Sequence, residues 1–167
     1  FDENNFFAIT RRKNQIEKVQ RGIQSALEYP ISIKLNVVVM HELNHQEILD
    51  FVRYTKDNQL TVRFIELMPF DEQQIWKKGR FFNCDQILTM IKDTYSVLEP
   101  LLGTATEHIR FKIPNHMGDI AIIPAYSRNI CGTCNRFRIT ADGKIRNCLY
   151  AQSEQDILQL LRSSATD

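Results

Sequence analysis

Apolar residues in the first part of the chain follow helical and strand-like spacings in turn. Over Gln15–Leu27 they recur every three or four residues, which predicts an amphipathic helix that ends before Pro30. The β-branched run Ile31–Met40 predicts a buried strand. A second amphipathic helix capped by Asn44 and a second strand at Leu60–Met68 follow. Helix, strand, helix and strand in this order predict parallel βα units.

The pattern changes after Pro69. Residues 70–80 are polar and predict a loop, and Asn83 with Gln86 forms a capping-box variant that opens a helix. Short β-rich runs then predict antiparallel strands, and a last helix is expected at Gln155–Leu161. We therefore expect two parts, residues 1–69 with βα units and residues 70–167 with a small antiparallel region that holds the cysteines. The four runs are Glu107–Ile113, Asp119–Pro124, Arg136–Thr140 and Lys144–Tyr150.

Two polar side chains interrupt the first predicted strand. Lys34 and Asn36 share one face because side chains alternate along a strand, and the opposite face is apolar. In the second strand, Glu66 shares a face with Met68, and Arg63 lies on the other. One interpretation is a Lys34–Glu66 ion pair that fills a barrel interior. The other is an interior that binds an anionic substrate or cofactor, as strand-end residues do in βα barrels.

Three cysteines predict a metal centre. Cys131 and Cys134 form C-G-T-C, and Cys148 returns after a strand, an Asp142-Gly143 turn and a second strand. Three converging thiolates suit an iron–sulfur cluster with one open iron, or a zinc site that lacks one ligand, which His116 could supply. A disulfide with a buried thiol is the remaining alternative.

The residues that flank this centre carry charge. Arg136 and Arg138 alternate along the strand after Cys134, so we expect both on one face, suited to a phosphate or carboxylate unless that face is only a solvated edge. Cys84, in the first turn of a predicted helix, is expected to be an ordinary, partly buried thiol.

Composition narrows the class of protein. The net charge of +1 gives no reason to expect a nucleic-acid partner. The sequence contains no run of about eighteen apolar residues, so no membrane span is predicted. Few cysteines in a chain of this length favour a reducing, cytoplasmic environment. The chain begins at Phe1 without a Met and ends at Asp167 just after an apolar helix, so we expect a fragment of a longer protein.

Several motifs together resemble the C-terminal half of the molybdenum cofactor biosynthesis protein A family, the radical S-adenosylmethionine GTP 3′,8-cyclases. They are I-T-R-R at 9–12, K-L-N-V-V-V-M at 34–40, V-R-F-I-E-L-M-P at 62–69, C-G-T-C-N-R-F-R-I-T-A-D-G-K at 131–144 and N-C-L at 147–149. The CxxxCxxC loop that the family places near the N-terminus of an incomplete βα barrel does not occur in this sequence, and neither does the C-terminal tail with paired glycines.

The resemblance implies an α/β fold, with part of an incomplete TIM-like barrel in 1–69 and the C-terminal domain with its auxiliary cluster in 70–167. It implies that Cys131, Cys134 and Cys148 hold an auxiliary [4Fe-4S] cluster whose open iron meets the guanine of GTP. It also implies a nucleotide site, contact of Met68 with S-adenosylmethionine, and a second [4Fe-4S] cluster in the complete enzyme. The nucleotide-site residues would be Lys34, Arg136, Phe137 and Arg138.

The implied function is the first step of molybdenum cofactor biosynthesis, conversion of GTP to 3′,8-cyclo-7,8-dihydro-GTP, by the complete protein and not by this segment alone. Cyclic pyranopterin monophosphate synthase would act downstream, and a homodimer is left open. Two other classes compete with this interpretation. One is another radical S-adenosylmethionine enzyme with an auxiliary cluster, against which the R-F-R at 136–138 argues. The other is a zinc-binding module, which usually shows two CxxC-like knuckles where this chain has one.

Overall fold

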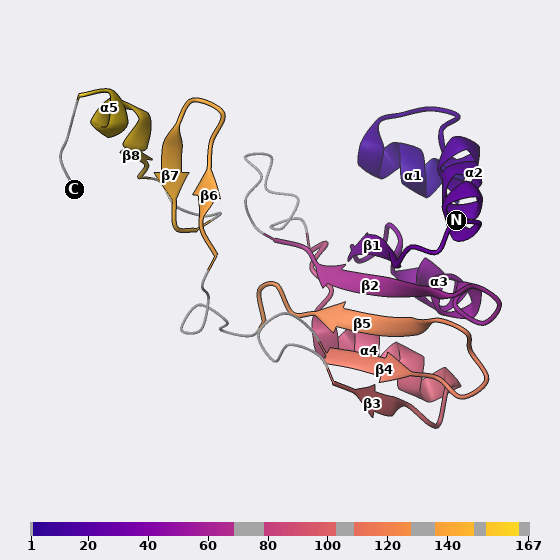
Figure 1. Ribbon diagram of the computed structural model, residues 1–167. Coiled ribbons are helices and arrows are strands. Elements are labelled where there is room, and N and C mark those ends of the chain that lie inside the picture. Colours follow the sequence, from indigo (N-terminus) through magenta and orange to yellow (C-terminus); the bar gives the residue numbers. More distant parts are fainter. Residues whose placement is uncertain (1, 69–78, 103–108, 128–135, 149–152, 164–167) are drawn as a thin grey trace. The chain divides into compact units, whose positions relative to one another are not determined.

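The chain forms two compact units, Phe1–Ile130 and Cys131–Asp167. The computed structural model (Figure 1) describes residues 2–68, 79–102, 109–127, 136–148 and 153–163. The loop predicted at 70–80 lies almost wholly outside the described residues.

A mixed sheet forms the first unit (Figure 1), with strand order β1-β2-β5-β4-β3. β1 pairs in parallel with β2, and β2 pairs in parallel with β5, whereas β4 is antiparallel to both β5 and β3. The strands predicted from β-branched runs are therefore present, but β5 joins the parallel part of the sheet on one side. The bounds are β1 Ile33–Val39, β2 Leu60–Glu66, β3 Glu99–Leu101, β4 Ile109–Lys112 and β5 Asp119–Ile123.

The predicted division near residue 70 does not separate these compact units. β2 lies before that position and β5 lies after it, and the two strands are hydrogen-bonded neighbours over five residue pairs, from Thr61 with Asp119 to Ile65 with Ile123. A boundary between independent units requires few contacts across it. Residues on both sides of position 70 therefore build one sheet, and the compact units divide after Ile130.

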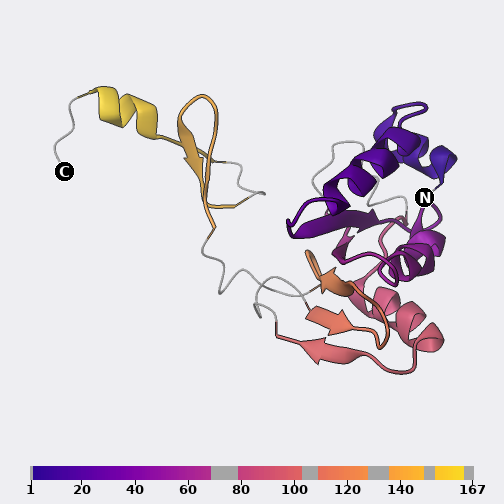
Figure 2. The ribbon, with the colours of Figure 1, turned by 45° about the vertical axis from the view of Figure 1, so that its right-hand side comes forward.

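Helices α3 and α4 cover one face of this sheet (Figure 2). Val62, Phe64, Ile120 and Ile122 of the central strands have at most 1% of their surface exposed. Burying each such side chain stabilises the fold by about 1.5–3 kcal/mol. Val52 of α3 and Ile87 and Ile91 of α4 are fully buried in the same core, and Ile23 and Leu27 of α2 pack against it. The helices are α1 Glu3–Thr10, α2 Ile16–Leu27, α3 Ile48–Tyr54 and α4 Cys84–Thr94.

Local capping explains where two of these helices begin. The capping box predicted for α4 is confirmed, because the Asn83 side chain accepts from the Gln86 N–H and the Gln86 side chain accepts from the Asn83 N–H. The cap predicted at Asn44 is wrong. Its side chain accepts from the Met40 N–H and donates to the Val38 carbonyl, and a 3₁₀ turn at residues 45–47 precedes α3. Asn44 thus holds the turn after β1.

The register of β1 and β2 decides which polar side chains share a face. Lys34 pairs with Thr61 and Asn36 pairs with Arg63, whereas Glu66 pairs with Val39 on the helix-covered face. Lys34 and Asn36 share one face, as the alternation predicted, and both are exposed. The Lys34–Glu66 ion pair considered above is wrong, because the two side chains project from opposite faces of the sheet.

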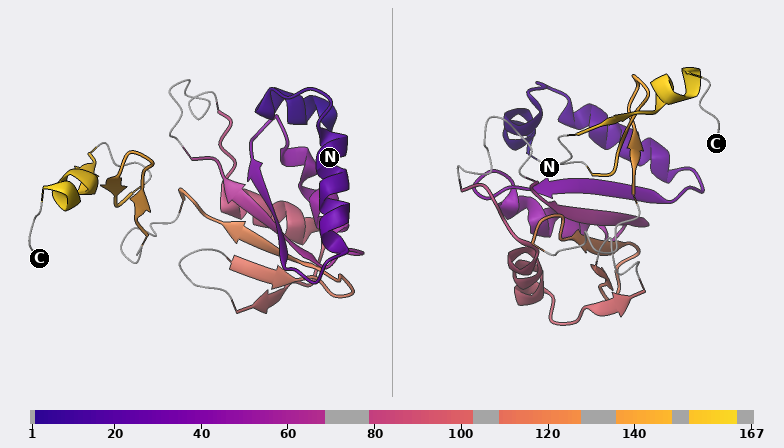
Figure 3. Two further views of the ribbon diagram at one scale, coloured as in Figure 1. Left: turned by 45° about the horizontal axis from the view of Figure 1, so that its top comes forward. Right: turned by 90° about the vertical axis from the view of Figure 1, so that its left-hand side faces the viewer.

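The second unit is a three-stranded antiparallel sheet followed by a short helix (Figure 3). The hairpin predicted around Asp142-Gly143 is confirmed, and Gly143 adopts a φ of +79°, which favours glycine. The Gly143 carbonyl accepts from the N–H groups of Ile157 and Leu158 and so ties the helix to the turn. The elements are β6 Arg138–Ile139, β7 Lys144–Arg146, β8 Gln155–Asp156 and α5 Ile157–Arg162.

The described helices are all too short or too polar to cross a lipid bilayer.

Candidate functional site

The hairpin turns the chain so that Cys148 approaches the start of β6. Arg138 pairs with Arg146 and Ile139 with Ile145. The hairpin thus returns the chain to Arg146, two residues before Cys148, beside Arg138, which follows Cys134 by four positions. Cys148 is half-buried. Cys131 and Cys134 lie outside the described residues, so the convergence of the three thiols stays a prediction. Among the residues that are described, no three His, Cys, Asp or Glu side chains gather as a metal site.

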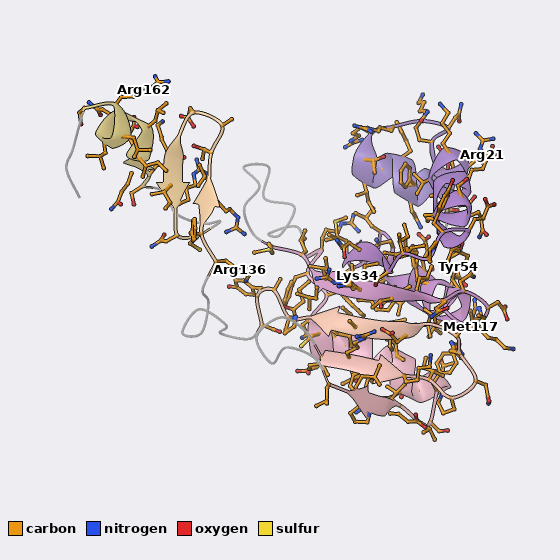
Figure 4. All side chains as sticks on the ribbon, viewed as in Figure 1. Arg21, Lys34, Tyr54, Met117, Arg136 and Arg162 are labelled. Carbon is orange, nitrogen blue, oxygen red and sulfur yellow. The ribbon has the colours of Figure 1, made fainter. Side chains whose placement is uncertain are left out.

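The basic residues after Cys134 differ in their placement. Arg138 opens β6 and is half-buried, whereas Arg136, labelled in Figure 4, is exposed and precedes the strand. The strand is thus shorter than predicted, and a shared face for both arginines stays a prediction. Phe137 is 63% exposed and lines a cavity of about 180 Å³ with Ile145 and Asn147.

Arg138 has no acidic partner in the described part of the chain, because the carboxylate of Glu154 pairs with the cations of β7. Arg146 lies directly opposite Arg138, where two like charges disfavour the sheet. Arg146 pairs instead with Glu154, which also approaches Lys144 at 3.3 Å. Glu154 therefore neutralises the cations on β7, and Arg138 is the charge that this sheet offers to an anion.

The face of the first sheet that α3 and α4 do not cover carries a second set of cations. Lys34 is exposed on β1 (Figure 4), and Arg63 lies on β2 directly beside Asn36. The Arg63 Nε is buried and has no hydrogen-bond partner among the described residues. Arg110, by contrast, donates to both carboxylate oxygens of Asp119 at 2.8 and 2.6 Å, and this partner raises the pKa of its guanidinium. Among the described residues, Lys34 and Arg63 are therefore candidate cations for an anionic ligand on this face.

Sequence reasoning missed Arg63 as a site residue. Alternation placed it on the face of β2 that does not carry Glu66, but the parallel register was needed to show that Lys34 lies on the same side. An arginine with a buried, unpartnered nitrogen is costly, which makes it a candidate ligand-binding group.

The C-terminal end of β2 holds a buried carboxylate. Glu66 is fully buried and accepts hydrogen bonds from the N–H groups of Cys84, Tyr126 and Ser127 and from the Ser127 hydroxyl. Burial raises the pKa of Glu66, but these four donors outweigh burial, and the net shift lowers it. Met68, the residue expected to contact S-adenosylmethionine, follows two positions later and is half-buried.

Cys84, predicted to be an ordinary and partly buried thiol, is buried more deeply than expected. It is 3% exposed, and its Sγ lies 3.3 Å from the Ser127 hydroxyl. Burial raises the pKa of this thiol, and the nearby carboxylate of Glu66 adds to the effect. A protonated, buried thiol is a poor nucleophile and a poor metal ligand.

His116 is engaged inside the first unit. Its Nδ1 lies 2.8 Å from the Thr55 hydroxyl, and Tyr95 contacts the ring edge-on at 5.5 Å between centroids. Burial lowers the pKa of His116, and the charges of Lys56 and Lys112 lower it further. The ring lies just before β5, at the N-terminal ends of the parallel strands. Met68 follows the opposite, C-terminal end of β2. His116 as a fourth zinc ligand stays a prediction without support from these contacts.

The fold defines the class of protein: an α/β unit with a parallel half-sheet is followed by a small antiparallel unit that carries Cys131, Cys134 and Cys148. The model of the Molybdenum Cofactor Synthesis C family matches residues 60–167, and the chain belongs to this family. The resemblance seen in the motifs is thereby confirmed.

Similar proteins include two bacterial proteins named GTP 3′,8-cyclase. The chain is 41% identical over 167 residues to that of Chlorobaculum tepidum, covering 99% of this chain and 50% of the relative. It is 37% identical over 155 residues to that of Alkaliphilus metalliredigens, covering 92% of this chain and 47% of the relative. Molybdenum cofactor biosynthesis protein 1 of Bos taurus is 40% identical over 164 residues, covering 97% of this chain and 26% of the relative. The chain spans half the length of these relatives or less.

Proposed function

We propose that this chain supplies the auxiliary-cluster and GTP-binding half of a GTP 3′,8-cyclase, which carries out the first step of molybdenum cofactor biosynthesis. The observation that carries the proposal is the identity of 41% to a protein of that name over essentially the whole of this chain. The relatives' names extend the assignment to bacterial and animal proteins of the same pathway.

The donor set fits an iron–sulfur cluster. Cys131, Cys134 and Cys148 would hold a [4Fe-4S] cluster, since three thiolates leave one iron open. Support comes from the confirmed hairpin, whose register returns Cys148 toward the start of β6. When bound, the cluster would offer its open iron to the guanine ring. The chain's own residues would orient the rest of the nucleotide.

Charge on two surfaces supports GTP as the ligand. On the second unit we assign Arg136 and Arg138 to the triphosphate, with Phe137 against the nucleotide. On the first sheet we assign Lys34, and we add Arg63 because its Nε has no other described partner. Cations match a polyanion, and arginine and lysine side chains can make charge-assisted hydrogen bonds to phosphate oxygens.

The rest of the proposal concerns the longer protein. Residues 1–69 would form βα units of an incomplete barrel, with Met68 against S-adenosylmethionine, and a second [4Fe-4S] cluster would lie in the part that this chain does not span. Residues 70–167 would be the C-terminal domain. This segment alone would be inactive as a cyclase, and its product would pass to cyclic pyranopterin monophosphate synthase.

A chimaeric enzyme tests the function. This chain would replace the matching half of the Chlorobaculum tepidum cyclase, and conversion of GTP would be assayed without oxygen. We expect activity in the chimaera and none in the isolated chain. An inactive chimaera that is folded and carries both clusters would contradict the proposal.

Single substitutions in that chimaera test the nucleotide site. Each charge-assisted contact contributes about 1.5–3 kcal/mol, so Arg136→Ala or Arg138→Ala should weaken GTP binding by about tenfold or more. The iron content should stay intact. Arg162→Ala is the matched control, because Arg162 is an exposed arginine on α5, and its GTP affinity should not change. Unchanged affinity in both arginine variants would show that Arg136 and Arg138 form only a solvated strand edge.

A further inference from the structure

Glu66 is the last residue of β2, and its carboxylate is fully buried without a cationic partner in the described residues. Its four hydrogen bonds come from two other segments. Oε1 accepts from the Cys84 N–H at 2.6 Å and from the Ser127 hydroxyl at 2.5 Å. Oε2 accepts from the Tyr126 N–H at 2.9 Å and from the Ser127 N–H at 2.8 Å.

These hydrogen bonds constrain the positions of two segments that are distant from Glu66 in the sequence. A buried carboxylate is tolerated only when its oxygens are fully hydrogen-bonded, so each donor must stay in place. One donor belongs to the first residue of α4, and the other three belong to a segment 60 and 61 residues further along the chain than Glu66. Glu66 therefore ties the C-terminal end of β2 to the start of α4 and to the residues that follow β5.

The position of that last segment gives the constraint a functional consequence. β5 ends at Ile123, and the turn after it is closed by a hydrogen bond from the Ala125 N–H to the Ile123 carbonyl. Tyr126 and Ser127 come next and are bound by Glu66. Cys131 follows Ser127 by four residues. The carboxylate thus fixes the last described point of the chain before the CxxC loop.

We propose that Glu66 is a positioning residue for the metal centre: it anchors the chain at Tyr126–Ser127 and so sets where the loop with Cys131 and Cys134 begins. The same side chain stands two residues before Met68, at the end of β2. The inference rests on the proposed function, since it requires a cluster at these cysteines.

The experiment uses the full 167-residue chain, reconstituted without oxygen with iron and sulfide. The rate at which the cluster loses iron to a chelator would be measured for Glu66→Ala and Glu66→Gln. Thr55→Val is the matched control. It removes a fully buried hydroxyl that bonds the Val52 carbonyl and His116, in the same unit but away from the segment before Cys131.

Losing the hydrogen bonds that hold Tyr126 and Ser127 should speed iron loss by about tenfold or more in Glu66→Ala, and weakening them to neutral bonds should speed it by a smaller factor in Glu66→Gln. The electron paramagnetic resonance spectrum of the reduced cluster should also broaden. Thr55→Val should lower the melting temperature and leave both readouts unchanged. If Glu66→Ala does not fold, Glu66→Gln decides the matter, because it keeps the side-chain volume and one acceptor oxygen.

Two results would overturn the positioning role. One is iron loss at the wild-type rate in the Glu66 variants, and the other is equal acceleration in Thr55→Val, which would reveal general destabilisation. A parallel Cys131→Ala variant separates this inference from the proposed function. If that variant kept the wild-type amount of iron, the cluster assignment itself would be wrong, and both proposals would fail together.

Discussion

Replacing Glu66 with Gln exchanges one of two acceptor oxygens for an NH₂ group, in a site where three backbone N–H groups can only donate and the Ser127 hydroxyl can also accept. If the remaining oxygen faces Tyr126 and Ser127, the NH₂ group meets the Cys84 N–H, which now lacks an acceptor. If the amide is turned over, two backbone N–H groups lose their acceptor instead. The first orientation is therefore favoured, because only one backbone donor is left unsatisfied.

The geometry sets the size of the effect. A hydrogen bond to a charged group is worth about 1.5–3 kcal/mol, and a neutral one about 0.5–1.5 kcal/mol. Losing the bond from Cys84 and weakening the two from Tyr126 and Ser127 should lower the free energy of unfolding by about 3–5 kcal/mol. A substitution with so large an effect is exceptional and would make Glu66 one of the most sensitive positions in the first unit.

Urea unfolding followed by circular dichroism at pH 7 measures this loss. Glu47→Gln is the matched control, since the Glu47 carboxylate accepts from the Asp2 N–H and the Asn5 side-chain amide and is only partly buried. There the NH₂ group can turn toward water, and a loss below about 1 kcal/mol is expected. A loss below about 1 kcal/mol at Glu66 as well would refute the reasoning.

Acidification tests independently whether the ionised Glu66 carboxylate stabilises the folded state. The hydrogen bonds hold the pKa of Glu66 below its ordinary value of 4.5, so the folded state binds this proton less readily than the unfolded state. The stabilisation is therefore fully present above pH 4.5 and is lost as the pH falls through the lowered pKa. The difference in stability between the wild type and Glu66→Gln should shrink over that range.

Three further predictions concern stability and titration. In Gly118→Ala the new Cβ would lie 2.2 Å from the Leu60 carbonyl oxygen, so urea unfolding should show a loss of about 1–3 kcal/mol; no loss would contradict this contact. Burial lowers the pKa of His116, so its contribution is complete above pH 6.5 and falls on acidification, and His116→Gln should flatten this slope; an unchanged slope would contradict it. The Thr140 hydroxyl lowers the pKa of Asp142 to about 2, and a nuclear magnetic resonance titration near 3.8 would contradict that bond.

Local patterns predicted the elements that depend on nearby residues. The helical spacing of Ile16–Leu27, the capping box at Asn83 and the Asp142-Gly143 turn all appear where expected. Each depends on contacts within a few positions of the chain, which a sequence displays directly. The helix Glu3–Thr10 was missed because its apolar residues follow no clear helical spacing, and its start depends on the Asp2 cap and on bonds to Glu47.

Contacts between distant segments could not be predicted in this way. The run at residues 119–123 looked like any antiparallel strand, and its parallel pairing with β2 follows from the sheet order. The partners of Glu66 lie 18, 60 and 61 residues away in the sequence, so no local spacing of residues could predict them. For the same reason the face of Arg63 became clear only from the register with β1. The candidate cysteines were visible from spacing alone, while their convergence stays a prediction.

Adding GTP to the chain reconstituted with iron and sulfide without oxygen tests the central claim most directly. The measurement is the electron paramagnetic resonance spectrum of the reduced cluster, recorded with and without GTP. If Cys131, Cys134 and Cys148 hold a [4Fe-4S] cluster whose open iron meets the guanine, the spectrum should shift when GTP is added and should disappear in Cys148→Ala. A spectrum that GTP leaves unchanged, or a chain that takes up zinc and no iron, would contradict the account.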